Sequence, residues 1–198
     1  MKRVTGTLAA LVIFGCSGCG TPSAPRDVDS SAQGTLTASS LQPPPQGPEI
    51  NPKVSYDPCT MIPDSAIRKA GYNPDTRKRY AGEVSPPKII LGCSFFEGSS
   101  SAYGLKIASS NTSLAEDKKF WENPAYRHDP VTTVTVNGRD GFSAKPMYQS
   151  EKCYLYFPTK FGDVALIRTS MPDSMSYDPC TGMVDLAELI EPTVGADN

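Results

Sequence analysis

Few side chains in this 198-residue chain have the type and the setting that chemistry needs. His128, the only histidine, lies in the polar stretch 126–130. A Ser-His-Asp hydrolase would have to use it as the general base, but no Gly-x-Ser-x-Gly turn is present to carry the nucleophile. We therefore expect His128 to be an ordinary surface residue.

Carboxylates are a second possible source of catalysis. Four of them could in principle supply the acid and the base of a glycosidase: Glu83, Glu97, Asp163 and Asp173. Their spacing singles out no two of them. A zinc site would need several His or Cys ligands, and the chain has neither a calcium loop nor a glycine-rich phosphate loop. The sequence therefore predicts no catalytic residue, no metal and no cofactor.

The hexapeptide SYDPCT occurs twice, at residues 55–60 and 176–181. Asp is a favoured helix N-cap and Pro a favoured first helical residue. Each copy is therefore predicted to begin a helical segment, with Cys59 and Cys180 in the first turn. The run MVDLAELI after the second copy has the apolar spacing of a helix.

Four cysteines of the expected domain, Cys59, Cys93, Cys153 and Cys180, allow three disulfide pairings. We expect Cys59–Cys180, which would tie the first helical turn to the closing helix, and Cys93–Cys153, which would join two strands. By loop-closure entropy each bridge would contribute roughly 4–5 kcal/mol. The competing interpretation is a reactive thiol, whose pKa a helix N-terminus would lower, and it requires an unpaired cysteine.

The first 15 residues are typical of an export signal. Lys2 and Arg3 precede an apolar run over residues 4–14, which is too short to span a membrane. Ile-Phe-Gly-Cys at the end of this run is similar to a bacterial lipobox, so we predict acylation, with palmitate among the acyl chains, at Cys16. Cys19 is the alternative acylation site, and an ordinary cleaved signal without lipid is a further alternative.

Composition divides the rest of the chain. Residues 16–52 are rich in Pro, Ser, Thr, Gly and Gln, and contain few large apolar side chains. Such a segment buries too little apolar surface to offset its ordering entropy. We predict a signal peptide over 1–15, a lipidated and disordered tether over 16–52, a folded domain over 53–194 and a tail over 195–198.

Apolar residues in the expected domain mostly alternate, which indicates strands. About six are predicted, over residues 88–97, 103–107, 131–136, 139–147, 153–157 and 164–167. Tight turns between strands, such as Asn137-Gly138, imply antiparallel pairing. The fold class is therefore α+β, with a single antiparallel sheet, N- and C-terminal helices packed on one face, and two disulfides. A further short helix is predicted near 113–123, with Ser113 and Glu116 spaced as a capping box.

Aromatic side chains mark the opposite face of this sheet. Because adjacent strand residues face opposite ways, Phe96, Tyr154 and Tyr156 would share the face away from the terminal helices, near Trp121. One interpretation is that the 110–130 segment covers this face. The other is a shallow aromatic groove that binds a lipid, a glycan or a protein.

The order of these motifs resembles a known family. Asp-Pro-Cys with a short helix, an aromatic strand around Cys93, a Val-x-Gly-x-x-Gly hairpin over 136–141, a strand with Cys153 and a closing helix after Asp178 are similar to mycobacterial-type, actinobacterial cell-envelope lipoproteins built on a four-cysteine domain of unknown function. That family commonly has Trp where this chain has Phe95. The resemblance implies an envelope location and two nested disulfides, and it supplies no catalytic residue.

The charge balance of 19 Lys+Arg against 21 Asp+Glu leaves no electrostatic footprint for nucleic acid. We predict a non-enzymatic, monomeric lipoprotein, anchored to the cell membrane at its extracytoplasmic face, that binds a small lipid or glycan ligand or an envelope protein. Two alternatives stay open: an envelope enzyme, either a hydrolase or a thiol oxidoreductase, and a structural or regulatory subunit of a membrane complex.

Overall fold

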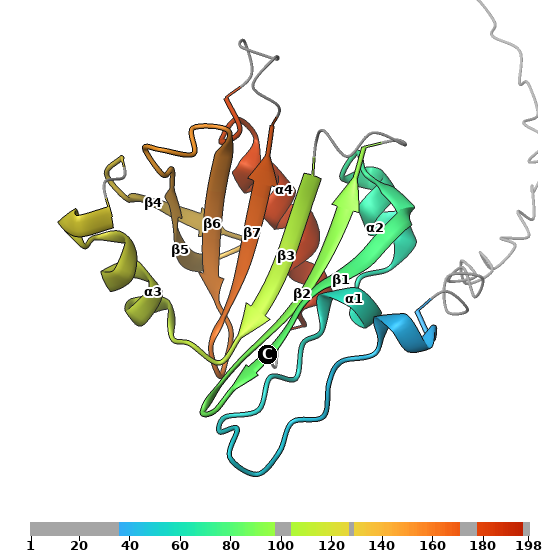
Figure 1. The fold of residues 1–198 in the computed structure, drawn as a ribbon. Helices are drawn as coiled ribbons and strands as arrows, with labels where there is room; N and C mark the ends of the chain where they lie inside the picture. The colour runs from blue at the N-terminus through green and yellow to red at the C-terminus, as the bar shows by residue number, and fades with distance from the viewer. Residues whose placement is uncertain (1–35, 98–103, 127–128, 171–177, 196–198) are drawn as a thin grey trace, which may run out of the picture. The chain divides into compact units, whose positions relative to one another are not determined.

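A computed structural model describes residues 36–97, 104–126, 129–170 and 178–195. Within this part of the chain, seven strands form one antiparallel sheet in the order β1-β2-β3-β7-β6-β5-β4 (Figure 1). The strands are β1 Asn73–Ser85, β2 Lys88–Phe96, β3 Gly104–Ser110, β4 Thr132–Val136, β5 Arg139–Ala144, β6 Lys152–Pro158 and β7 Asp163–Thr169. The predicted α+β class with a single antiparallel sheet is confirmed.

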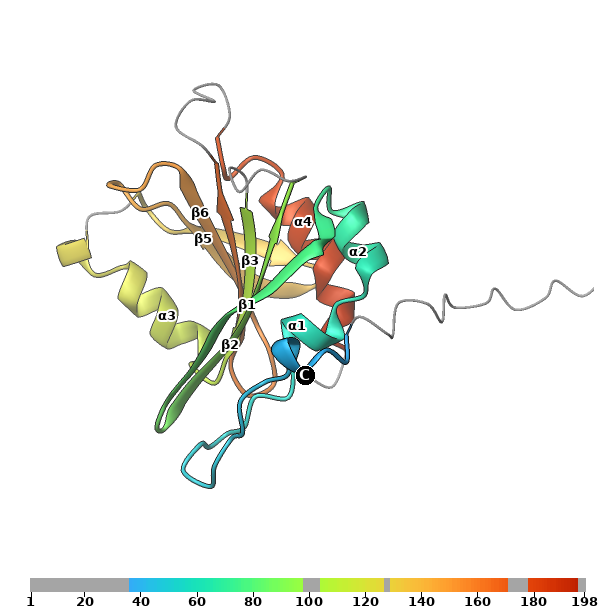
Figure 2. The same ribbon diagram turned by 45° about the vertical axis from the view of Figure 1, so that its right-hand side comes forward.

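Helices lie on both faces of this sheet. They are α1 Pro58–Met61, α2 Asp64–Lys69, α3 Leu114–Trp121 and α4 Met183–Ile190, with short 3-10 turns at η2 Ser39–Leu41, η3 Pro124–Tyr126 and η4 Glu191–Thr193. Helices α1, α2 and α4 cover one face, as predicted for the terminal helices, and α3 lies on the other (Figure 2).

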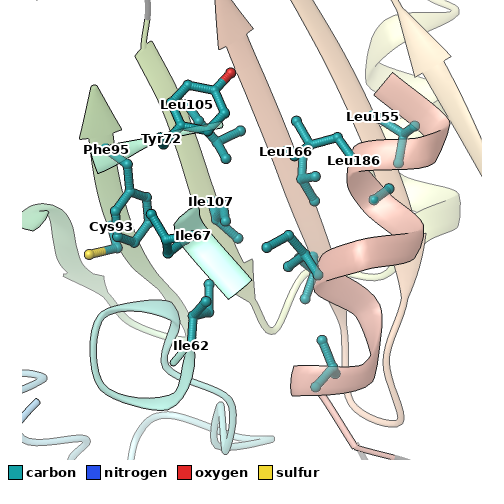
Figure 3. Close-up of a cluster of buried hydrophobic side chains, with 14 of the residues drawn as sticks. Ile62, Ile67, Tyr72, Cys93, Phe95, Leu105, Ile107, Leu155, Leu166 and Leu186 are labelled. Atoms are coloured by element: carbon teal, nitrogen blue, oxygen red, sulfur yellow. The ribbon is translucent and has the colours of Figure 1, made fainter. Parts of the chain in front are cut away.

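The main core lies between the sheet and helices α1, α2 and α4. Figure 3 shows Phe95 of β2 directed toward Ile67 of α2, and Leu166 of β7 close to Leu186 of α4. Burying an aliphatic or aromatic side chain of this size contributes about 1.5–3 kcal/mol relative to leaving it exposed. Alternation then directs the intervening residues of each strand to the face that carries α3.

Strand β1 is the strand that the sequence pattern did not reveal. Its residues NPDTRKRYAGEVS are mostly polar and show no apolar alternation. It forms a long hairpin with β2 that turns at Pro86-Pro87, and it lies at the edge of the sheet. Charged side chains suit an edge strand because they discourage pairing with another chain.

The disulfides pair differently from the prediction. The bridges are Cys59–Cys93 and Cys153–Cys180, whereas we expected Cys59–Cys180 and Cys93–Cys153. The reason is the strand order: β3 and β7 separate the strands that carry Cys93 and Cys153. Three inter-strand spacings amount to about 14 Å, and a disulfide spans at most about 7 Å between Cα atoms.

Both hexapeptides form the same local hydrogen bond. The Cys59 N–H donates to Asp57 Oδ1 at 3.2 Å, and the Cys180 N–H donates to Asp178 Oδ1 at 3.1 Å. Asp57 caps α1 as predicted, so Cys59 lies in its first turn. Cys180 instead lies in a turn before α4, because Gly182 adopts a left-handed φ of 69° and the helix begins only after it.

The strand registers place Cys93 and Cys153 at equivalent positions on either side of the Lys106–Ile167 pair of β3 and β7. Cys93 pairs with the residue after Lys106, and Cys153 pairs with the residue after Ile167. Each cysteine of β2 and β6 therefore holds an equivalent place in its half of the sheet, and each bonds the cysteine of one hexapeptide.

The aspartate of each hexapeptide also forms an ion pair with a cation at an equivalent place beside the bonded strand cysteine. Arg79 is paired with Cys93 on β1, and its guanidinium lies 2.6 Å from the Asp57 carboxylate. Lys145 directly follows the last residue of β5, and its ammonium lies 3.0 Å from Asp178. The repeated sequence thus serves the same purpose twice. Its cysteine ties a turn to β2 in the first copy and to β6 in the second, and its aspartate neutralises a neighbouring cation.

Residues upstream of the predicted domain start at residue 53 also pack against the domain. Leu41 and Ile50 are 7% and 2% exposed, although we assigned residues 16–52 to a disordered tether. The Gln46 side chain holds this segment through two hydrogen bonds to the Val54 backbone, at 2.8 and 2.9 Å. Arg79 also donates to the Leu41 carbonyl. Two apolar anchors and these polar contacts therefore order residues 36–52; the remainder of the predicted tether lies outside the described residues.

Candidate functional site

Helix α3 positions the aromatic side chains that the sequence singled out. Its start is the predicted capping box: the Glu116 N–H donates to Ser113 Oγ at 3.3 Å, and the Ser113 N–H donates to Glu116 Oε2 at 3.0 Å. This cap fixes where the helix begins, and two turns later the buried Trp121 lies against the sheet.

Trp121 closes over the two tyrosines of β6. Its Nε1–H donates to the Tyr156 hydroxyl at 3.2 Å, and its ring centroid lies 4.8 Å from that of Tyr154. Phe142 of β5 stacks on Tyr156 at 4.7 Å. Burial raises the pKa of the Tyr156 hydroxyl, so this group remains a neutral hydrogen-bonding partner. Among the described residues, Trp121 of α3 therefore covers the aromatic side chains of β5 and β6, which agrees with the first of our two interpretations.

Phe96 does not join this cluster. It pairs with Gly104 of β3, and β3 and β7 lie between it and Tyr154. The four aromatic residues predicted as a ligand face, Phe96, Tyr154, Tyr156 and Trp121, are thus divided between two parts of the same sheet face.

The part of this face around Phe96 carries side chains that the sequence analysis missed. The pairing register places Lys78, Ser94, Lys106 and Ile167 in one row across β1, β2, β3 and β7. The Lys106 ammonium lies 4.9 Å from the centre of the Tyr80 ring. Lys78 and Tyr80 belong to β1, so a prediction without this strand had no means of placing them.

A pair of acidic residues lies where α3 meets the ends of β3 and β7. Asp163 is 2% exposed, its Oδ1 accepts from Ser110 Oγ at 2.9 Å, and no described residue forms a hydrogen bond with its Oδ2. Burial, followed by the neighbouring Asp117 of α3, raises the pKa of Asp163 to about 9. This carboxyl is therefore protonated at neutral pH.

Cysteine thiols are another candidate for chemistry. The cysteines of the domain are all bonded in pairs, so none of Cys59, Cys93, Cys153 and Cys180 offers the thiolate of an oxidoreductase. His128, Cys16, Cys19 and Asp173 lie outside the described residues.

The described residues contain no group of three or more His, Cys, Asp or Glu side chains that could hold a metal ion. None of their helices is long and apolar enough to cross a membrane.

The fold and this face together define an α+β domain braced by two disulfides, with an aromatic and lysine-bearing sheet surface. Residues 11–193 match the family described as "Protein of unknown function (DUF3558)", and the chain belongs to this family. No curated protein and no solved structure is similar enough to match. The resemblance to a domain of unknown function is thereby confirmed, and the family description assigns neither an activity nor a location.

Proposed function

We propose that this chain is a lipoprotein anchored at the outer face of a bacterial cell membrane, and that its domain binds a ligand rather than catalysing a reaction. The export signal before Cys16 and two disulfides support the location, since disulfides persist in oxidising compartments. The observation that carries the binding function is the sheet face beside α3, where lysines adjoin the partly exposed rings of Phe96 and Tyr80.

Palmitate labelling of the full chain in a bacterial host tests the anchor. Buried acyl methylenes contribute about 0.8 kcal/mol each, so two or three acyl chains hold a protein at a membrane. Cys16→Ser is expected to abolish both the label and recovery in the membrane fraction, while Cys19→Ser keeps both. The reverse result would move the anchor to Cys19, and an unlabelled wild-type chain would refute lipidation.

Native mass spectrometry of the full chain, released gently from envelopes, tests the binding function. We expect a fraction of the molecules to retain a mass beyond that of the acylated chain. A retained small molecule supports a ligand-binding module, whereas a retained polypeptide supports the alternative of a subunit in a membrane complex. A chain that carries neither, in detergents that preserve other lipoprotein complexes, would count against binding.

A further inference from the structure

We infer that the sheet face beside α3 binds one anionic lipid molecule, with its phosphate on two lysines and its acyl chains along the neighbouring apolar side chains. We call this surface the lysine–aromatic face; it consists of Lys78, Tyr80, Phe96, Lys106 and Ile167. The inference rests on the proposed binding function and names the class of ligand.

The pairing register places two lysines on either side of β2, on the same face of the sheet. Lys78 and Lys106 both pair with Ser94, from opposite sides, so their backbones are two inter-strand spacings apart, or about 10 Å. Both side chains leave the sheet on the face that carries α3. The long stems of two lysines can span this distance and reach a phosphate between them, as compact cations with three donors each.

The charges of the face are not neutralised from within the described chain. No described carboxylate lies within ion-pair distance of Lys78 or Lys106; the contact of Lys106 is with the Tyr80 ring. By contrast, Arg77 and Arg79, which flank Lys78 on β1, each have a carboxylate within 2.7 Å. Two cations on one face of a chain with net charge −2 therefore favour an anionic ligand.

Apolar surface continues directly from the lysines. Tyr80 is 38% exposed, Phe96 and Ile167 are partly exposed, and Figure 2 shows the described helix on this side, α3, placed over β5 and β6 instead. Ile167 pairs directly with Lys106. A phosphate alone would leave these apolar side chains exposed to solvent, whereas the acyl chains of a phospholipid would cover them. The combination points to an amphiphile.

Calorimetric titration of the full chain with dihexanoyl phosphatidylglycerol, kept below its micelle concentration, tests the inference without a bilayer. We expect saturable binding that weakens about tenfold in Lys106→Gln and in Lys78→Gln, and further as salt is added. Lys69→Gln is the matched control, because Lys69 is an exposed lysine of α2 on the opposite face, and it is expected to bind as the wild type does. Circular dichroism and disulfide mapping of each variant establish that it is folded.

Two further ligands separate the sources of affinity. Dihexanoyl phosphatidylcholine has the same chains without net charge, and glycerol phosphate has the anion without chains; both are expected to bind at least tenfold more weakly. Equal binding of either one, unchanged binding by Lys106→Gln, or no binding at all would overturn the inference. The binding function itself would survive if native mass spectrometry then found an uncharged ligand or a protein partner.

Discussion

Asp163 is the side chain whose protonation is most strongly tied to folding. Its usual pKa near 3.8 rises to about 9, because the folded domain buries the carboxyl beside Asp117. Since the folded state binds this proton more tightly than the unfolded state, the contribution to stability is fully present below about pH 4. It is lost progressively as the pH rises toward 9, by at most about 1.4 kcal/mol per pH unit.

Asp163→Asn is therefore expected to flatten the dependence of stability on pH. The neutral amide keeps the size of the protonated carboxyl, can accept from Ser110, and cannot ionise. Urea unfolding at pH 5 and pH 8 measures the difference, which should be clearly smaller in the variant than in the wild type. Asp75→Asn, at an exposed position of β1, is the control. If the wild type and Asp163→Asn lost the same free energy of unfolding between pH 5 and pH 8, Asp163 would have the same pKa in the folded and unfolded states.

The two hexapeptides offer a matched comparison of a buried and an exposed ion pair. The side chains of Asp57 and Arg79 are 6% and 13% exposed, whereas those of Asp178 and Lys145 are 53% and 28% exposed. Asp57→Ala leaves a buried guanidinium without its carboxylate, and the expected cost is about 3–5 kcal/mol. Asp178→Ala removes a solvated pair and one turn hydrogen bond, for about 1 kcal/mol.

Chemical denaturation of both variants measures these costs on equal terms, because each substitution removes the same residue from the same six-residue sequence. A larger loss from Asp178→Ala than from Asp57→Ala would contradict the assignment of the buried pair to the first copy.

At the scale of elements, two features stabilise α3: the capping box at its first turn and the contacts of Trp121, its last residue, with the sheet. Ser113→Ala removes one half of the capping box, which typically costs about 1 kcal/mol of helix stability. Because Trp121 is the only tryptophan in the chain, its fluorescence reports on α3 directly. We expect a red-shifted emission and faster amide exchange in α3, with little change in exchange across β2 and β3.

Ser65→Ala is the control for this experiment, since Ser65 is an exposed residue of α2 on the other face of the sheet. Emission from Ser113→Ala at the wild-type wavelength, with unchanged exchange, would show that Trp121 and its contacts fix α3 without the cap.

The elements that could be predicted are those with local signals. The capping box at Ser113 begins α3 as expected, and Asn137-Gly138, with φ values of 47° and 86°, turns the hairpin of β4 and β5. These signals act over a few residues, so they survive in any tertiary context. β1 gave no such signal, because a polar edge strand acquires its conformation from pairing with β2 rather than from its own pattern.

The same distinction explains the candidate site. Alternation correctly directed Tyr154 and Tyr156 to the face opposite the terminal helices. It could not tell how many strands separate Phe96 from them, because strand order is a long-range property. The disulfide pairing failed for the same reason: the expected Cys93–Cys153 bridge joined two strands that β3 and β7 separate in the sheet.

At the scale of the whole domain, the described sheet consists of two halves, β1-β2-β3 and β7-β6-β5-β4, that meet along the β3–β7 ladder. Each half has its own bridge, because Cys59–Cys93 closes within the first half and Cys153–Cys180 within the second. A hydrogen bond joins the beginning and the end of the described domain: the Tyr56 hydroxyl lies 2.8 Å from Thr193 Oγ1.

Because each bridge belongs to one half, removing them should have independent effects. The loops span 34 and 27 residues, for which loop-closure entropy gives about 3.5–4 kcal/mol each. The double variants Cys59→Ser/Cys93→Ser and Cys153→Ser/Cys180→Ser are therefore expected to lose similar free energies of unfolding. Disulfide mapping of the unreduced wild type should recover each bonded pair in a separate cross-linked peptide. Sites without shared contacts are additive within about 0.5 kcal/mol, so the quadruple variant should lose the sum, to the point of unfolding. A recovered Cys59–Cys180 peptide, or one double variant that unfolds while the other is unaffected, would mean that the two halves are not braced separately, and the repeated hexapeptide would need a different explanation.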